Sequence, residues 1–461
     1  MTILAAFMVP HPPLIIPDVG KGGEEQIRAT IDAYENIASQ IAELRPETII
    51  ITSPHAVMYA DYFHISPGGS ASGSFRQFRA PEVRFSERYD TELVKRIREL
   101  ADAEEFPAGT LGERDASLDH GTMVPLWFIR KRYAGGKIVR IGLSGLPLTD
   151  HYHLGQIIAR AAEYAGRRAV VIASGDLSHK LQEYGPYGFA KEGPEYDRRL
   201  IDACERGSLG ELLDFSESLC SRAAECGHRS FTIMAGTLDG LDVTARVYSH
   251  EDVTGVGYGI CSFYPGSPDP SRHFAEIREE KELKRIADMK SDSDAWVALA
   301  RSSVEHYILK GEKLPIPENL PPPFYTAKAG VFVSIHKFGS LRGCIGTIAP
   351  ATENIAEEII SNAVSASSRD PRFAPIEPEE LKWLEINVDV LEEPEKIDSP
   401  DQLDVREYGV IVTSGGRRGL LLPDLEGVDT VEQQIDIARR KAGIPDGEKV
   451  SLQRFKVTRH R

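Results

Sequence analysis

Three histidines each follow an apolar run that predicts a buried β-strand. His11 and His55 come directly after Pro10 and Pro54, and His179 follows a short polar turn. The three apolar runs are residues 3–9, 47–53 and 168–173. Proline has a fixed φ and no N–H, so it ends a strand and restricts the loop that carries the histidine. Imidazoles held in this way suit metal binding or proton transfer near neutral pH.

The elements around these histidines indicate how they are positioned. Residues 24–44 have helical periodicity and connect the first two predicted strands. A strand, a helix and a second strand in this order form a βαβ unit with parallel strands. Ligands bind at the carboxyl ends of such strands. We therefore expect an α/β domain with a mostly parallel central sheet flanked by helices, in which His11 and His55 face one cleft.

A late acidic residue, Glu225, completes a set of side chains that can bind a metal. Two imidazoles and one carboxylate are the ligands of non-haem Fe(II) oxygenases, and they leave coordination positions open for substrate and O2. A further histidine near the metal can act as general acid or base. Asp176, three residues before His179, can accept that ring's second N–H. The chain has 13 histidines, and histidines at strand ends can equally cap backbone groups.

Length, charge and cysteine content limit the class of protein. The chain has 461 residues, enough for two domains, and its formal net charge is −16. This charge disfavours nucleic acid and anionic membranes as partners. The five cysteines contain no Cys-x-x-Cys pair, and no apolar run is long enough to span a bilayer. We expect a cytoplasmic protein, with a homodimer as the default assembly.

A proline-rich stretch at residues 265–270 separates two parts of the chain. The charged residues that follow it predict a linker or an exposed helix. Beyond them, strands, helices and hairpins alternate in a mixed order that is typical of an α+β domain. The predicted organisation is a first domain over residues 1–265, a charged linker over 266–294 and a second domain over 295–461.

Four motifs in the first domain support a family resemblance. They are Val-Pro-His-Pro-Pro-Leu at 9–14, Ser-Pro-His at 53–55, Asp-His-Gly at 119–121 and Ser-Gly-Asp-Leu-Ser-His at 174–179. Together they resemble the class III extradiol ring-cleavage dioxygenases of the LigB type, and the related Memo proteins. The first resemblance implies Fe(II) held by His11, His55 and Glu225. It also implies that His179 is the acid/base and that His120 contacts the substrate.

The third ligand has a rival, because Cys226-Gly227 resembles the Memo pattern, in which a cysteine occupies the metal site. A thiolate ligand favours softer metals such as Cu(I) or Zn. The sequence analysis favours Glu225. It predicts an extradiol-type oxygenase acting on a catecholic or similarly chelating small molecule. The alternative is a Memo-like metal-binding redox or interaction protein without ring cleavage, and a third hypothesis is hydrolysis assisted by Zn.

A further motif, Ser-Leu-Arg-Gly-Cys-Ile-Gly-Thr at 340–347, resembles the AMMECR family over residues 295–458. Arg342 can bind an anion, Gly343 can let a ligand approach the backbone, and Cys344 can act as a nucleophile. Equally, the glycines can make a bend in a strand, with Cys344 a small core residue. The fusion of the two halves resembles the AmmeMemoRadiSam system, which implies a radical SAM protein as partner.

Overall fold

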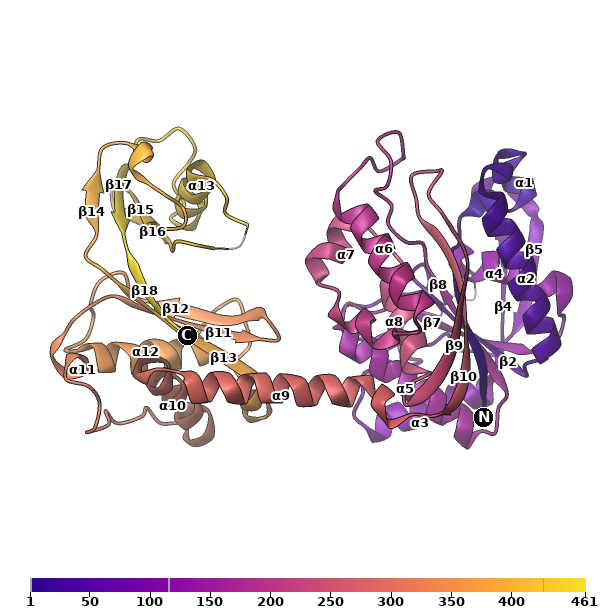
Figure 1. The fold of residues 1–461 in the computed structure, drawn as a ribbon, viewed down its shortest axis with the longest axis horizontal. Helices are drawn as coiled ribbons and strands as arrows, with labels where there is room; N and C mark the ends of the chain where they lie inside the picture. The colour runs from indigo at the N-terminus through magenta and orange to yellow at the C-terminus, as the bar shows by residue number, and fades with distance from the viewer. Residues whose placement is uncertain (1, 115–116, 426) are drawn as a thin grey trace. The chain divides into compact units, whose positions relative to one another are not determined.

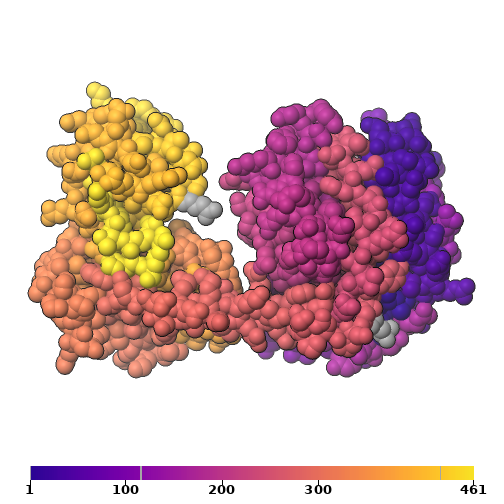
Figure 2. All heavy atoms as spheres, viewed as in Figure 1, coloured from indigo at the N-terminus to yellow at the C-terminus, as the bar shows by residue number. Residues whose placement is uncertain are grey.

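A computed structural model describes residues 2–114, 117–425 and 427–461. The chain divides into two compact units, residues 1–278 and 279–461 (Figure 1). Figure 2 shows the close atomic packing of each unit. The charged segment predicted as a linker is mostly helical, because it contains α9 (Phe274–Asp292).

The first unit is built on a six-stranded mixed sheet. Its strand order is β7 (Lys137–Gly142), β2 (Thr48–Ser53), β8 (Ala169–Ser174), β1 (Ile3–Val9), β10 (Tyr258–Pro268) and β9 (Leu241–Glu251). The first four strands are parallel, β10 is antiparallel to β1, and β9 is antiparallel to β10. The predicted mostly parallel sheet is confirmed.

Helices cover both faces of this sheet (Figure 1). Alternate residues of β1 point to opposite faces, so Phe7 joins one core and Met8 the other. The core around Phe7 includes α2 (Arg28–Leu44) and α4 (His120–Arg132). The core around Met8 includes α3 (Thr91–Ala103), α5 (Leu148–Tyr164), α6 (Glu192–Glu205) and α8 (His228–Gly236). Burial on both sides explains why the strands are continuously apolar in sequence.

The strand order brings the predicted histidine loops to one edge. Strand β8 lies between β1 and β2 and is parallel to both. The loops after β1, β2 and β8 therefore leave the sheet side by side. The smaller elements of this unit are α1 (Pro17–Gly20), β3 (Phe63–His64), β4 (Ser70–Phe75), β5 (Ala80–Arg88), β6 (Ala108–Gly109) and α7 (Glu217–Ala223).

The second unit contains two antiparallel sheets and is α+β, as predicted. The first sheet has the order β12 (Ser340–Gly346), β11 (Val331–Lys337), β13 (Leu384–Leu391) and β18 (Val457–His460). The second has the order β14 (Glu395–Ile397), β17 (Ser451–Phe455), β15 (Gly409–Ser414) and β16 (Arg417–Leu421). Helices α10 (Ala295–Lys310), α11 (Pro323–Thr326) and α12 (Ile355–Ser368) pack with the first sheet, and α13 (Val431–Lys441) packs with the second. No helix in the described residues is long and apolar enough to cross a membrane.

Candidate metal site

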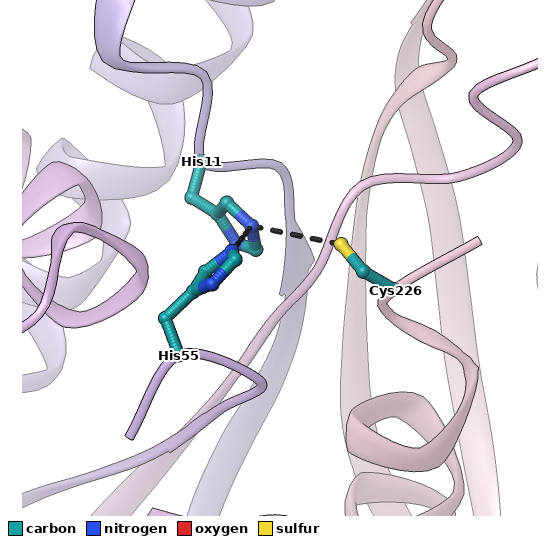
Figure 3. Close-up of side chains that lie close together, drawn as sticks. All are labelled: His11, His55 and Cys226. Atoms are coloured by element: carbon teal, nitrogen blue, oxygen red, sulfur yellow. Dashed lines mark hydrogen bonds between the residues drawn. The ribbon is translucent and has the colours of Figure 1, made fainter. Parts of the chain in front are cut away.

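Two imidazoles and one thiol converge where the loops after β1 and β2 meet the segment before α8 (Figure 3). The Nε2 atoms of His11 and His55 are 3.0 Å apart. The Cys226 Sγ is 3.6 Å from the His11 Nε2. All three donor atoms lie within 4.8 Å of one another. This cluster is the candidate metal site.

The spacing of these donors fits one bound ion. Bonds of about 2.1 Å to nitrogen and 2.3 Å to sulfur place the two ligand atoms about 3.6 Å apart at a tetrahedral angle. The distance between the His11 and Cys226 donors agrees with this value. The donor set is nevertheless two imidazoles and a thiol, which differs from the two histidines and one carboxylate of non-haem Fe(II) oxygenases.

The His11 side chain is fixed in one tautomer by Ser174. The Ser174 hydroxyl donates to the carbonyl of Gly121 at 2.6 Å, so its oxygen is left to accept a hydrogen bond. The His11 Nδ1, 3.0 Å from that oxygen, must therefore carry the proton. This leaves the lone pair of Nε2 directed at the cluster. Burial and the neighbouring His55 lower the pKa of His11 to about 3, so the ring is neutral at pH 7.

We predict that Ser174→Ala weakens metal binding by about 10- to 100-fold, the usual cost of losing a group that orients a histidine ligand. The substitution leaves the Nδ1–H without its acceptor, so the ring can change tautomer. A competition titration with a chromophoric chelator measures the affinity. Thr232→Ala, which also removes a buried hydroxyl of this unit, is the control and is expected to keep the wild-type affinity. Equal losses in both variants would contradict a specific role for Ser174.

A second network holds His55 and His120. The His55 backbone N–H donates to the Ser53 Oγ at 3.2 Å, and that hydroxyl donates to Asp119 Oδ1 at 2.6 Å. Asp119 is the N-cap of α4 and accepts from the Thr122 N–H at 3.0 Å. His120, the first residue of this helix, has its ring centroid 4.0 Å from that of His55. Burial, with further contributions from His55 and His11, lowers the pKa of His120 to about 3.

Glu225 and Cys226, the two alternatives for the third ligand, have different hydrogen-bond partners in the structure. The Glu225 carboxylate accepts a hydrogen bond from the His228 N–H at 2.6 Å. It thus provides an acceptor for a backbone N–H in the first turn of α8. Burial raises its pKa to about 7. Cys226 instead points at the histidines, and its sulfur accepts from the Asp176 N–H at 3.2 Å. Among the described residues, the compact donor groups contain Cys226 and not Glu225.

Two glycines allow Cys226 to reach the histidines. A Cβ on Gly175 would lie 2.1 Å from the Cα of Gly227. The turn after β8 therefore touches the backbone next to Cys226, and no side chain fits between them. The sequence motif 174–179 contains Gly175, but nothing in the sequence indicates which segment it contacts.

Asp176 and His179 form a second compact group with Cys226. One oxygen, nitrogen or sulfur atom from each of these three residues lies within 4.8 Å of the others. The Asp176 carboxylate accepts from the His11 backbone N–H at 2.8 Å, so this hydrogen bond supports the His11 loop and not the His179 ring. Burial raises the pKa of Asp176 to about 6.

His179 keeps a free ring nitrogen. Its Nε2 is buried and has no hydrogen-bond partner among the described residues. The ring of Tyr187, which the sequence analysis did not single out, stacks on it with centroids 5.0 Å apart. Burial lowers the pKa of His179 despite the opposing effect of Asp176, so the neutral ring is the dominant form at pH 7.

In the second unit, two of the three residues predicted to form a ligand site, Arg342 and Gly343, make contacts that support the fold. The Arg342 guanidinium donates to the Glu380 carboxylate at 3.0 and 2.8 Å, and to the carbonyls of Ala374 and Pro375. A Cβ on Gly343 would lie 2.2 Å from the carbonyl oxygen of Ala366, so this glycine lets β12 pack against α12. The third predicted residue, Cys344, accepts a hydrogen bond at its Sγ from the Ser334 hydroxyl at 3.2 Å.

The Arg342–Glu380 pair predicts a pH-dependent contribution to stability. Burial disfavours the charged form of Glu380. The hydrogen bonds from Arg342 and Lys337 have a larger, opposite effect, and the pKa of Glu380 is lowered to about 2. A depressed folded-state pKa stabilises the fold above the unfolded value and loses that effect as pH falls. Glu380→Gln should therefore cost on the order of 1 kcal/mol at pH 7. The difference from wild type should vanish between about pH 4.5 and 2. Urea unfolding followed along that range tests this, and a difference that grows on acidification would contradict it.

Comparison with known families agrees with the two-part architecture. Residues 5–261 match the family model "Catalytic LigB subunit of aromatic ring-opening dioxygenase", and residues 297–460 match AMMECR1. The chain belongs to the LigB family, and its C-terminal part is an AMMECR1 domain. Both of these predicted resemblances are confirmed.

Individual proteins match the chain over its whole length or over part of it. The protein CA_C1420 of Clostridium acetobutylicum is 42% identical, with all of both chains covered. A Thermotoga maritima protein is 47% identical over 36% of this chain and 97% of its own length. The crystal structure of PH0010 from Pyrococcus horikoshii is 32% identical, with a TM-score of 0.34, and covers 36% of this chain and 88% of its own.

Proposed function

We propose that the N-terminal domain binds one metal ion through His11, His55 and Cys226, and that it acts as a metal-binding redox or interaction protein. The observation that carries this proposal is the convergence of these three donor atoms within 4.8 Å. Glu225, the carboxylate that an Fe(II) oxygenase would require, is hydrogen-bonded to the start of α8 instead.

The electrostatics of the site support a bound cation. Burial, together with Asp176, raises the pKa of the Cys226 thiol well above its usual value. A bound metal reverses this balance, because a coordinating thiol is deprotonated. The two histidines are neutral, so their lone pairs are available to the ion. A thiolate with two imidazoles suits Cu(I) or Zn better than a hard cation.

Extradiol-type oxygenation with Fe(II) is the second candidate, because the surroundings of the site offer proton-transfer groups. His120 lies against His55, and His179 has a buried ring nitrogen free of hydrogen bonds to described residues. A neutral histidine in this position can take a proton from a bound small molecule. A catecholic or similarly chelating substrate and a radical SAM partner, both implied by resemblance, belong to this second proposal.

Metal content after anaerobic purification, paired with O2 consumption on a panel of catechols, distinguishes the two candidates. The proposal predicts close to one equivalent of copper or zinc, no catechol-dependent O2 uptake, and loss of the metal in His55→Ala. One equivalent of iron with catechol-dependent uptake that His55→Ala abolishes would replace it with the oxygenase. Wild-type protein that binds none of these metals would refute both.

A further inference from the structure

Residues 174–179, which follow β8, contact both His11 and Cys226. The Asp176 carboxylate accepts from the His11 backbone N–H at 2.8 Å, and the Asp176 N–H donates to the Cys226 Sγ at 3.2 Å. Ser174, at the start of the same segment, fixes the His11 ring. The position of this segment therefore sets the distance between the His11 and Cys226 donor atoms.

The buried side chain of Asp197, on α6, anchors the other end of this segment. Its Oδ1 accepts from the Ser178 N–H at 2.9 Å. A Cβ on Gly257 would lie 2.2 Å from the Asp197 Oδ2, so a side chain at that position would displace the carboxylate. A hydrogen bond from a backbone N–H to a carboxylate is charge-assisted, so it holds the segment more strongly than a neutral acceptor would.

The second oxygen of Asp197 faces His250 on β9. The His250 Nε2 lies 2.8 Å from the Asp197 Oδ2, and it is the donor because an ionised carboxylate only accepts. This hydrogen bond raises the pKa of His250. The His250 side chain is 33% exposed and lines an open cavity of about 390 Å³, so its ring can exchange protons with solvent. When the ring loses its proton, the buried carboxylate loses its counter-ion.

The other charged groups around His250 lie on two elements. They are Arg198, Asp202 and Glu205 of α6, and Asp252 in the turn after β9. Asp252 adds to the effect of Asp197 on the pKa of His250. Within residues 2–114, 117–425 and 427–461, Asp197 alone forms an ion pair with His250. A change in the charge of His250 therefore acts first on Asp197.

We propose that Asp197 is a positioning residue for the metal site, and that protonation of His250 strengthens the hold of Asp197 on residues 174–179. The metal affinity then depends on the charge of a histidine that lies outside the site. The support from the cationic ring is complete below the pKa of His250 in the folded protein and is lost as pH rises through that value. This inference rests on the proposed metal binding by His11, His55 and Cys226.

Hydrogen–deuterium exchange of the metal-free, full-length protein tests the anchor separately from the metal. Asp197→Ala removes both acceptor oxygens, so peptides covering residues 174–179 should exchange about 10-fold faster than in wild type at the same pH. Asp197→Asn keeps an oxygen that can accept from the Ser178 N–H, and it should restore most of the protection. Circular dichroism checks that both variants are folded. Wild-type exchange in a folded Asp197→Ala protein would overturn the proposal.

Zinc competition with a chromophoric chelator, repeated across pH, tests the coupling to the metal site. Metal binding releases the Cys226 proton in every variant, so the informative quantity is the ratio of wild-type to variant affinity at each pH. His250→Gln keeps a neutral donor for Asp197 and removes the charge. We expect a ratio of about 3 near pH 6 and about 1 near pH 9, because a charge-assisted hydrogen bond is stronger than a neutral one. Asp197→Ala should lower the affinity about 10-fold across this range.

His273→Gln is the matched control for His250→Gln. His273 pairs with Asp239 at 2.9 Å in the same unit, and this hydrogen bond likewise raises its pKa. The other hydrogen-bond partners of Asp239 are Tyr152, Gln156 and Phe274. The affinity of this variant should equal that of wild type at every pH.

The outcomes separate this inference from the metal site on which it rests. A ratio for His250→Gln that does not change with pH, or one that His273→Gln reproduces, would overturn the control by His250. Failure of the wild-type protein to bind zinc would refute the metal site and the control of its affinity together. The exchange measurement would still decide whether Asp197 anchors residues 174–179.

Discussion

Cys226→Ser is expected to lose more than about 100-fold in metal affinity, whereas Glu225→Gln should stay within about 3-fold of wild type. Loss of a metal ligand should lower the metal affinity more than loss of a neighbouring group that orients a ligand. Loss of such an orienting group typically lowers the affinity about 10- to 100-fold. Cys226 Sγ lies in the donor cluster, and the Glu225 carboxylate faces the His228 N–H. Glutamine keeps an oxygen that can accept that hydrogen bond, so the start of α8 is preserved.

Chelator competition with Zn measures both variants, and circular dichroism checks that each is folded. The pair is informative because the two residues are adjacent and both are partly buried. If Glu225→Gln lost the metal and Cys226→Ser kept it, the carboxylate assignment made from sequence would be correct and the present site would be wrong.

Gly175→Ala is expected to reduce both stability and metal affinity. Its Cβ would lie 2.1 Å from the Gly227 Cα, a distance that only a backbone shift can relieve. Forced overpacking of this kind typically costs about 1–3 kcal/mol. The shift separates the turn after β8 from the segment carrying Cys226, so we expect metal affinity to fall at least 10-fold, as for a lost orienting group.

Gly69→Ala is the matched control for this substitution. Gly69 lies in the same unit, and a Cβ there would meet no atom within 4 Å. Urea unfolding of the metal-free protein and Zn competition give the two effects separately. Wild-type affinity in a folded Gly175→Ala protein would show that the contact with Gly227 does not position Cys226.

Much of the fold was predictable because its signals are local. The strand at Ile3–Val9 ends before Pro10 with the bounds expected from its apolar run. The parallel arrangement of β1 and β2 followed from the helix that connects them. The sequence did not indicate that β8 lies between them, because strand order depends on packing between distant segments.

The candidate site was predictable in its histidines and less so in its remaining groups. His11 and His55 each follow a strand. The βαβ pattern predicts that these two strands are parallel, so both histidines are expected at the same edge of the sheet. Glu225 and Cys226 are adjacent in sequence, and the choice between them depends on how the first turn of α8 is capped. Ser174 fixes the His11 ring through two hydrogen bonds to segments far away in the chain, and no local pattern reveals such contacts.

The same limit applies to the AMMECR1 domain. The motif around Cys344 was visible in the sequence, but its neighbouring Arg342 binds Glu380. Arg372, 28 positions after Cys344 in the sequence, donates to the Cys344 carbonyl. Tertiary packing, and not sequence proximity, selects the residues that surround the sulfur.

X-ray absorption spectroscopy of the zinc-loaded protein tests the central claim most directly. The His11, His55 and Cys226 site predicts one sulfur ligand at about 2.3 Å, with nitrogen ligands at about 2.0–2.1 Å. Cys226→Ser should remove the sulfur contribution from any metal that remains bound. A wild-type spectrum with nitrogen and oxygen ligands alone would contradict this ligand set. It would indicate a carboxylate as the third ligand.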